Sequence, residues 1–378
     1  MQIWEYLADF LDYWMEVQRL NKDIPGIQAA IRYDGKLIYS CALGIADQKG
    51  TKLTSSHIFR FASHSKTFTA TAIMKLIDDG KLRLDDKIGQ YLDFLNPQDK
   101  NIAEVTIREV LSHMGGIFRD GPVDWSQFVS EKELQGYFHQ HVSILNRNEK
   151  YKYSNAGFAL LGMVIARVSG QSYEEYVTKN IIKPAQLKLT TPDYVKDRRQ
   201  YAKGFSSKIP DGKRKEIDCA IPTRSFAAAG GFCSTAEDMS LFYEQLMNGK
   251  IIPESRLNEL LAPEIDRGNK WVYGLGFMGR KINRIKFSGH TGGFISQSSI
   301  SLFNRREKLA VSFVMSGDES VSPTPFAEAM LKIFYFFKDN DEAITHAEYP
   351  QLRAAAAMAC EAVYVLSLIH ISEPTRLG

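Results

Sequence analysis

The run Ser63-His64-Ser65-Lys66 has the residue types and the spacing of a nucleophile and its base. Apolar residues at helical intervals follow it as far as Gly80, so the run predicts the start of a helix with Ser63 and Lys66 on one face. A serine hydroxyl needs an adjacent base, and burial lowers the pKa of a lysine amine enough to provide one. A capped helix with a solvated lysine has the same pattern. The position of this single S-x-x-K, at the start of an apolar helix, favours the chemical interpretation.

The run Tyr153-Ser154-Asn155 precedes an apolar segment, 156–169, that has helical periodicity and ends at Gly170. We therefore expect the run at a junction between a loop and a helix. A phenol beside a lysine can have a lowered pKa and relay a proton to a leaving group, while the Asn155 amide can both donate to and accept from a substrate amide. A helix-capping asparagine beside a core tyrosine is the alternative.

The glycine-rich run Ser288-Gly289-His290-Thr291-Gly292-Gly293 comes just before two strand-like segments. Glycines at such a place allow a substrate backbone to approach closely. His290 is expected to donate a hydrogen bond to Tyr153 or to the substrate. The competing interpretation is a glycine-rich turn with an exposed histidine.

Strand-like and helical segments near both ends of the chain must position these three runs. Residues 1–20 have helical spacing, and Asp34-Gly35 joins two strand-like segments at 27–33 and 36–40, which predicts a hairpin. A second hairpin is predicted from 298–303 and 309–315, followed by a helix over 323–338. Between residues 82 and 188 the periodicity is mainly helical, and 203–222 is expected to be a long returning loop. The pattern predicts an α+β fold with one antiparallel sheet built from both chain ends and a mostly helical insert.

Composition excludes several other classes of protein. The 378 residues carry 47 Lys+Arg against 44 Asp+Glu, and a net charge of +3 argues against a nucleic-acid partner. No apolar run is long enough to span a membrane, and the first residues lack a signal-peptide pattern, so the default location is cytoplasmic, with a periplasmic one left open. The four cysteines lack metal-ligand spacing, and His139 and His141 do not share a helix face, so no metal or cofactor is expected.

The three runs, in this order, resemble the motifs of the serine β-lactamase and penicillin-binding-protein superfamily. They look most like the branch with class C β-lactamases, D-aminopeptidases and carboxylesterases. Three flanking segments are similar to the family as well: Phe59–Ala62, Leu111–Gly116 and Gly230–Met239. The resemblance covers roughly residues 20–340 and implies the β-lactamase/transpeptidase-like fold.

The resemblance also implies a role for each site residue. Ser63 would be the acylated nucleophile, and Lys66 and Tyr153 would share the general-base and general-acid work, with their division left open. Asn155 would contact the substrate amide, and the backbone N–H groups of Ser63 and Gly293 would form an oxyanion hole. His290, Thr291 and Gly292 form the third triplet. Penicillin-targeted members usually have lysine at its first position, so His290 points away from carboxylate-bearing substrates.

Together these arguments predict a serine hydrolase that forms an acyl-enzyme with small esters or amides, including D-amino-acid peptides. A β-lactamase or D-Ala-D-Ala carboxypeptidase is the enzyme alternative, and a non-catalytic scaffold protein with the same fold is the other. The hydrolase domain is expected over 1–338, with sheet parts at about 1–80 and 220–338 and the insert at about 81–219. Residues 339–365 would be a linker or truncated extension, and 366–378 resemble a non-native tail.

Overall fold

The computed structural model describes residues 2–99, 101–122, 127–196, 200–208, 212–262, 264–317 and 321–341. Nearly all of the predicted 339–365 segment, and all of the predicted tail 366–378, lie outside these residues. The chain divides into two compact units, one comprising 1–23 with 328–378 and the other 24–327. These boundaries differ from the predicted sheet-and-insert division, which stays a prediction.

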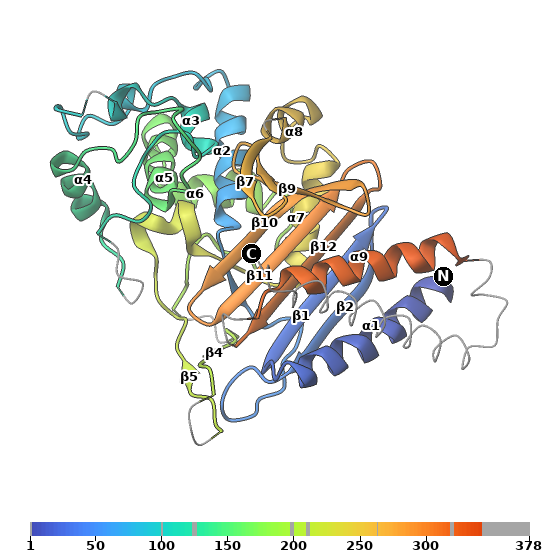
Figure 1. The fold of residues 1–378 in the computed structure, drawn as a ribbon. Helices are drawn as coiled ribbons and strands as arrows, with labels where there is room; N and C mark the ends of the chain where they lie inside the picture. The colour runs from blue at the N-terminus through green and yellow to red at the C-terminus, as the bar shows by residue number, and fades with distance from the viewer. Residues whose placement is uncertain are drawn as a thin grey trace, which may run out of the picture. The chain divides into compact units, whose positions relative to one another are not determined.

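An eight-stranded sheet dominates the described part of residues 24–327 (Figure 1). Its order is β2-β1-β12-β11-β10-β9-β8-β7, and neighbouring strands are antiparallel. Strands from both ends of this unit therefore lie side by side, with β1 paired to β12, as the sequence predicted. The sheet strands are β1 (Gly26–Tyr33), β2 (Lys36–Gly44), β7 (Ile265–Gly268), β8 (Trp271–Tyr273), β9 (Met278–Ile282), β10 (Ile285–Phe294), β11 (Gln297–Asn304) and β12 (Leu309–Ser316).

Both predicted hairpins are confirmed. Strands β1 and β2 are joined by Asp34 and Gly35, whose φ angles of 47° and 80° are those of a tight two-residue turn that suits the twist of the strands. Strands β11 and β12 pair in register from Gln297 opposite Ser316 to Asn304 opposite Leu309. These turns fix the registers that bring the distant sequence segments together.

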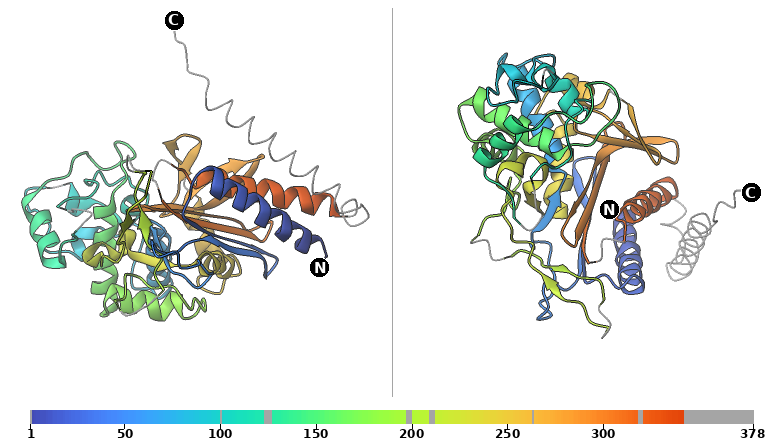
Figure 2. Two further views of the ribbon diagram at one scale, coloured as in Figure 1. Left: turned by 90° about the horizontal axis from the view of Figure 1, so that it is seen from below. Right: turned by 60° about the vertical axis from the view of Figure 1, so that its left-hand side comes forward.

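The predicted helices are confirmed where the local signals were strong. Ser172 and Glu175 form the expected capping box, and Gly170 ends the preceding helix with φ of 69°. Figures 1 and 2 show α3 to α6 gathered beside α2 and away from β1 and β2. The α-helices are α1 (Gln2–Asn21), α2 (Ser65–Asp78), α3 (Ile107–Leu111), α4 (Glu131–Gln140), α5 (Asn155–Ser169), α6 (Tyr173–Val177), α7 (Ala236–Met247), α8 (Glu254–Leu261) and α9 (Thr324–Asp339).

Two sequence interpretations are corrected. The run Ser288–Gly293 lies inside strand β10, because its residues pair with β11 on one side and, in part, with β9 on the other. The competing interpretation of a glycine-rich turn is therefore wrong, whereas the run does precede the two strands of the second hairpin, β11 and β12. The expected loop over 203–222 contains a two-stranded ribbon of β4 (Gly204–Phe205) and β5 (Glu216–Ile217), which two residue pairs hold together.

A small two-stranded sheet positions the first motif. Strand β3 (Phe59–Ala62) pairs with β6 (Phe232–Ser234), and α2 starts three residues after β3 ends. The β3 backbone also approaches β10 closely, since a Cβ added to Gly292 would lie 2.1 Å from the Phe61 carbonyl oxygen. The absence of a side chain at residue 292 therefore lets the strand of the third motif lie against the strand that leads to Ser63.

The other unit contains α1 and most of α9. Aromatic residues of the two helices meet: the Trp4 and Phe334 rings stack with centroids 5.5 Å apart, and those of Phe10 and Phe337 are 5.8 Å apart. The amphipathic pattern of residues 1–20 thus serves helix packing, as expected. No helix among the described residues combines the length and the apolar character that crossing a membrane requires.

Candidate active site

Ser63 occupies the sharp turn between β3 and α2. Ala62, the residue before it, is buried and has a φ of 49°, a left-handed conformation that costs energy for a residue with a side chain. The hydroxyl of Ser65 holds the turn by donating to the Ala62 carbonyl oxygen at 2.6 Å and accepting from the Phe232 N–H at 3.0 Å. Ser63 itself is half-buried, so its hydroxyl stays accessible while its surroundings are packed.

The Lys66 amine lies under Ser63 in the first turn of α2. Its Nζ is 3.3 Å from Ser63 Oγ and donates to Asn155 Oδ1 at 2.7 Å and to the Ala229 carbonyl oxygen at 2.6 Å. The side chain is fully buried, and burial lowers the pKa of the amine well below its usual value of 10.5. The turn that leads into α2 brings Lys66 to the hydroxyl, with the Lys66 N–H donating to the Ser63 carbonyl oxygen at 3.1 Å, and packing makes the amine a usable base.

Tyr153 approaches Ser63 from the loop before α5. Ser154 caps that helix by accepting from the Gly157 N–H at 2.8 Å, which fixes the loop-to-helix junction predicted from the sequence. The Tyr153 hydroxyl donates to Ser63 Oγ at 2.9 Å. Its pKa differs from the sequence expectation: burial raises the pKa of the phenol, whereas a neighbouring lysine was expected to lower it.

Asn155 forms hydrogen bonds with Lys66 of the first motif and with Asp120, a residue that the sequence did not single out. While its Oδ1 accepts from Lys66, its Nδ2 donates to Asp120 Oδ1 at 2.6 Å. Both polar atoms are thus used within the protein, and the side chain is 5% exposed. The contact with a substrate amide remains a prediction. Asp120 lies in an Arg-Asp-Gly run that is typical of a surface turn, so nothing in the sequence distinguished it.

The third motif lies along β10, and its histidine is buried. His290 Nε2 is 3.0 Å from the Tyr273 hydroxyl, and its Nδ1 is 2.6 Å from the Thr291 carbonyl oxygen. Because His290 is 1% exposed, the alternative of an exposed histidine is wrong. The hydrogen bond expected to Tyr153 or to the substrate is made to Tyr273 instead. Burial is the largest cause of a pKa well below 6.5, which keeps the ring neutral.

Thr291, Gly292 and Gly293 continue the strand past His290. The Thr291 hydroxyl donates to Met278 Sδ at 3.5 Å, Gly292 abuts β3, and Gly293 is exposed. Strand β9 pairs with β10 only as far as Gly289, so the backbone from His290 onward has no β9 partner. The substrate-binding role of these residues remains a prediction.

The sequence profile described as Beta-lactamase matches residues 10–331. The chain belongs to the β-lactamase family. Its fold agrees with that assignment, because solved members of the β-lactamase/transpeptidase fold superpose on most of the chain.

Individual relatives of this β-lactamase-family chain include a penicillin-binding protein and two enzymes that act on amides. Penicillin-binding protein 4* of Bacillus subtilis is 25% identical over 329 residues, covering 79% of this chain and 69% of that protein. A D-stereospecific amidohydrolase from Streptomyces sp. has a TM-score of 0.65 at 26% identity, over 78% of this chain and 90% of that one. A D-amino acid amidase from Ochrobactrum anthropi SV3 has a TM-score of 0.74 at 22% identity, over 89% and 100%.

The length of the curated relatives limits what such matches imply. In three further relatives, 29% to 31% identical, the match spans 61%, 49% and 35% of the relative's length. The chain therefore spans less than two thirds of those β-lactamase-family proteins.

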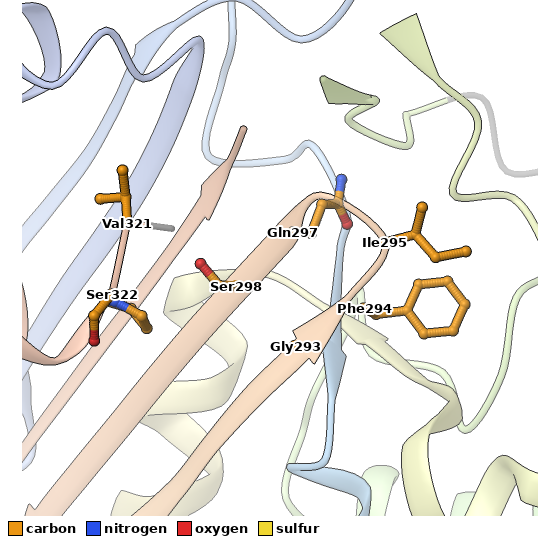
Figure 3. A pocket seen from close by; sticks show the side chains of 8 residues that line it. Gly293, Phe294, Ile295, Gln297, Ser298, Val321 and Ser322 are labelled. Atoms are coloured by element: carbon orange, nitrogen blue, oxygen red, sulfur yellow. The ribbon is translucent and has the colours of Figure 1, made fainter. Parts of the chain in front are cut away.

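A cavity of about 560 Å³ lies where β10 and β11 meet. Figure 3 shows Phe294 and Ile295 at the β10–β11 turn, with Val321 and Ser322 on the opposite side of the view. Gly293, the expected oxyanion residue, also lines the cavity, whereas Ser63, Lys66 and Tyr153 do not. The cavity therefore adjoins the third motif rather than the reactive hydroxyl.

His139 and His141 both make hydrogen-bond contacts with backbone carbonyl groups. His139 Nδ1 is 3.2 Å from the Phe94 carbonyl oxygen, and His141 Nδ1 is 2.9 Å from that of Tyr137. Within the described ranges, no three His, Cys, Asp or Glu side chains come together as a metal site would require.

Proposed function

We propose that this β-lactamase-family chain is a serine hydrolase that forms an acyl-enzyme on Ser63 and acts on small amides and esters, including D-amino-acid amides. One observation carries the proposal: the hydroxyl of the half-buried Ser63 accepts from the half-buried Tyr153 phenol at 2.9 Å and lies 3.3 Å from the buried Lys66 amine. Packing alone does not require these three groups to converge. Their arrangement is that of a nucleophile with an adjacent base and acid.

The pKa directions support a division of the proton transfers. The Lys66 amine, whose pKa is lowered, takes the proton of Ser63 as Oγ attacks the substrate carbonyl. The oxyanion of the tetrahedral intermediate accepts from the backbone N–H groups of Ser63 and Gly293. Tyr153, whose pKa is raised, keeps its proton until it donates it to the leaving amine or alcohol. Water then attacks the acyl carbon and gives its proton to the Tyr153 phenolate. The Lys66 ammonium returns its proton to Ser63 Oγ, which leaves as the acid is released and the free enzyme is restored.

The neutral, buried His290 supports the choice of substrate class. A lysine at this position would place a cation beside the third motif to attract a carboxylate, whereas His290 carries no charge near pH 7. Similarity to a D-stereospecific amidohydrolase at 26% identity also favours amides of D-amino acids. Similarity to a penicillin-binding protein favours the second candidate, a D-Ala-D-Ala carboxypeptidase or β-lactamase.

Intact-mass analysis tests the acyl-enzyme. Wild-type protein treated with a fluorophosphonate or a p-nitrophenyl ester should gain one covalent adduct, and Ser63→Ala should gain none. Lack of an adduct on the wild type, or an equal adduct on Ser63→Ala, contradicts the proposal. Rates with D-phenylalanine amide, L-phenylalanine amide, a p-nitrophenyl ester and a chromogenic cephalosporin then separate the substrate classes. Faster turnover of the cephalosporin than of the ester and both amides would favour the second candidate.

A further inference from the structure

His113 occupies a backbone position that suits glycine better than histidine. Helix α3 ends at Leu111, Ser112 caps it, and His113 follows with a φ of 60° in the left-handed region. Glycine and asparagine are the usual residues at this place after a helix, because a larger side chain is strained there. His113 belongs to a family-like segment, but the proposed chemistry gives it no task.

Two hydrogen bonds of His113 hold the residues on either side of Tyr153. The imidazole Nδ1 accepts from the Ser154 N–H at 3.1 Å, and the His113 carbonyl oxygen accepts from the Lys152 N–H at 2.9 Å. The loop that carries the phenol is therefore fixed both before and after Tyr153. Only the first of these bonds depends on the side chain.

The His113 ring also packs directly on the phenol that it flanks. The ring centroids of His113 and Tyr153 are 4.4 Å apart, those of His113 and Tyr273 are 4.7 Å apart, and His113 is 2% exposed. Tyr273 in turn contacts His290, so His113 lies between the second and third motifs.

The protonation state of His113 follows from these surroundings. Burial is the largest cause of a pKa well below 6.5, and the nearby Lys66 and Arg267 lower it further. The ring is therefore neutral. Because Nδ1 accepts a backbone proton, the ring proton is on Nε2, which has no acceptor among the described residues.

We propose that His113 is a positioning residue of the hydrolytic centre: its Nδ1, by accepting from the Ser154 N–H, holds the Tyr153 hydroxyl against Ser63 Oγ. This inference rests on the proposed function of Tyr153. His113 touches neither Ser63 nor Lys66 through a hydrogen bond, so it acts through the loop alone. A small displacement of the phenol is enough to slow proton transfer, since a misplacement of about 1 Å can cost ~100-fold in rate.

Two substitutions separate the hydrogen bond from the packing of the ring. His113→Phe keeps a ring against Tyr153 but removes the acceptor, whereas His113→Asn removes the ring and places an amide oxygen where Nδ1 was. We expect His113→Phe to lower kcat for a p-nitrophenyl ester by about 10-fold or more with KM within about two-fold, and His113→Asn to stay within about three-fold. A role in packing alone predicts the opposite order, because asparagine leaves a cavity, and that order would overturn the proposal.

A double-mutant comparison tests whether His113 acts through Tyr153. In the Tyr153→Phe background, the added His113→Phe change should lower kcat by less than about two-fold, because the group that it positions is already gone. An undiminished 10-fold effect in that background contradicts the proposal. His141→Phe, at an exposed histidine after α4, is the matched control and should leave kcat unchanged.

A spectroscopic readout keeps this test independent of turnover. In protein with ¹³C-labelled tyrosine, the Tyr153 signal is assigned by its loss in Tyr153→Phe. We expect His113→Phe to shift that signal and lower the pH at which the phenol ionises, and His113→Asn to change both much less. If wild-type protein forms no acyl adduct, the proposed hydrolase fails while the spectra still decide whether His113 positions Tyr153. Identical Tyr153 signals in wild type and His113→Phe would overturn the inference.

Discussion

The Lys66 amine contacts no carboxylate in the described structure. Its hydrogen-bond partners are Ser63 Oγ, Asn155 Oδ1 and the Ala229 carbonyl oxygen, and burial is the largest influence on its pKa. A buried lysine without an ion-pair partner favours the neutral form. The site therefore gains a base at the expense of stability at lower pH.

The dependence of the melting temperature on pH should reveal the stability that is lost by burying the Lys66 amine. Because the folded-state pKa of Lys66 is lowered from 10.5, the unfolded chain binds the extra proton, and folding loses stability as the pH falls from 10.5 toward the folded-state pKa. Lys66→Met removes this dependence. The melting temperature of Lys66→Met relative to wild type should therefore rise as the pH is lowered from 9 to 6. A difference that stays constant or falls over that range would show that the amine is charged in the folded state.

Asp120 provides a second test of the same amine. Its negative charge raises the pKa of Lys66 against the effect of burial, and its carboxylate accepts from Asn155. Asp120→Asn should lower the Lys66 pKa further, so that the base loses its proton at lower pH. The acidic limb of kcat/KM against pH, measured with a p-nitrophenyl ester, should then move to lower pH. A limb that stays in place or moves upward would exclude Lys66 as the group that titrates there.

At the scale of elements, the close approach of β10 to β3 leaves no room for a side chain at Gly292 but leaves room for one at the adjacent Gly293. A Cβ on Gly292 would lie 2.1 Å from the Phe61 carbonyl oxygen and 2.6 Å from Ser299 Oγ, whereas a Cβ on Gly293 would meet nothing within 4 Å. The backbone of β3 cannot move without carrying Ser63 with it. The third motif and the nucleophile are therefore coupled through this one contact.

The substitutions Gly292→Ala and Gly293→Ala test this coupling. We expect Gly292→Ala to lower the melting temperature clearly and to cost more than about 1 kcal/mol, in the range of overpacked cores. Gly293→Ala should leave the melting temperature within about 1 °C of wild type, because its Cβ enters open space. Thermal unfolding monitored by circular dichroism measures both. Equal effects of the two changes would mean that β3 and β10 are not in contact as described.

At the scale of the unit formed by residues 24–327, one buried arginine ties distant segments to β3. Arg60 is 1% exposed, and its guanidinium donates to the carbonyl oxygens of Cys219, Ile221 and Gly231 and pairs with Asp193 at 3.2 Å. Its backbone N–H donates to Gln297 Oε1 at 2.9 Å, so Arg60 also contacts the first residue of β11, just after the β10–β11 turn. The planar fork of donors suits this task better than an ammonium would.

Replacing Arg60 should therefore destabilise the fold strongly. Arg60→Met removes the guanidinium donors from three carbonyl oxygens and leaves Asp193 without its cation, and loss of one partner of a buried pair costs about 3–5 kcal/mol. Arg83→Met is the control, since its side chain is 85% exposed and its pair with Asp86 should contribute less than about 1 kcal/mol. Urea unfolding gives both free energies. A cost below 1 kcal/mol for Arg60→Met would contradict the role assigned to it.

The sequence by itself determined the features that depend on neighbours along the chain. Turn chemistry at Asp34-Gly35, the capping box at Ser172 and the helix stop at Gly170 each act within a few residues, so their types and spacing predicted the local structure. The three motifs, in the family's order, could likewise be recognised from the sequence. Their resemblance to the family predicted the fold, which the comparisons support.

Only the tertiary structure decided which environment each of these groups meets. The raised pKa of Tyr153, the burial of His290 against Tyr273 and the contact of Asp120 with Asn155 all depend on segments that are distant in sequence. Desolvation and hydrogen bonding across such distances leave no periodic pattern in the chain. For the same reason the sequence left a glycine-rich turn open as an alternative for the third motif, and only its pairing with β11 placed it in a strand.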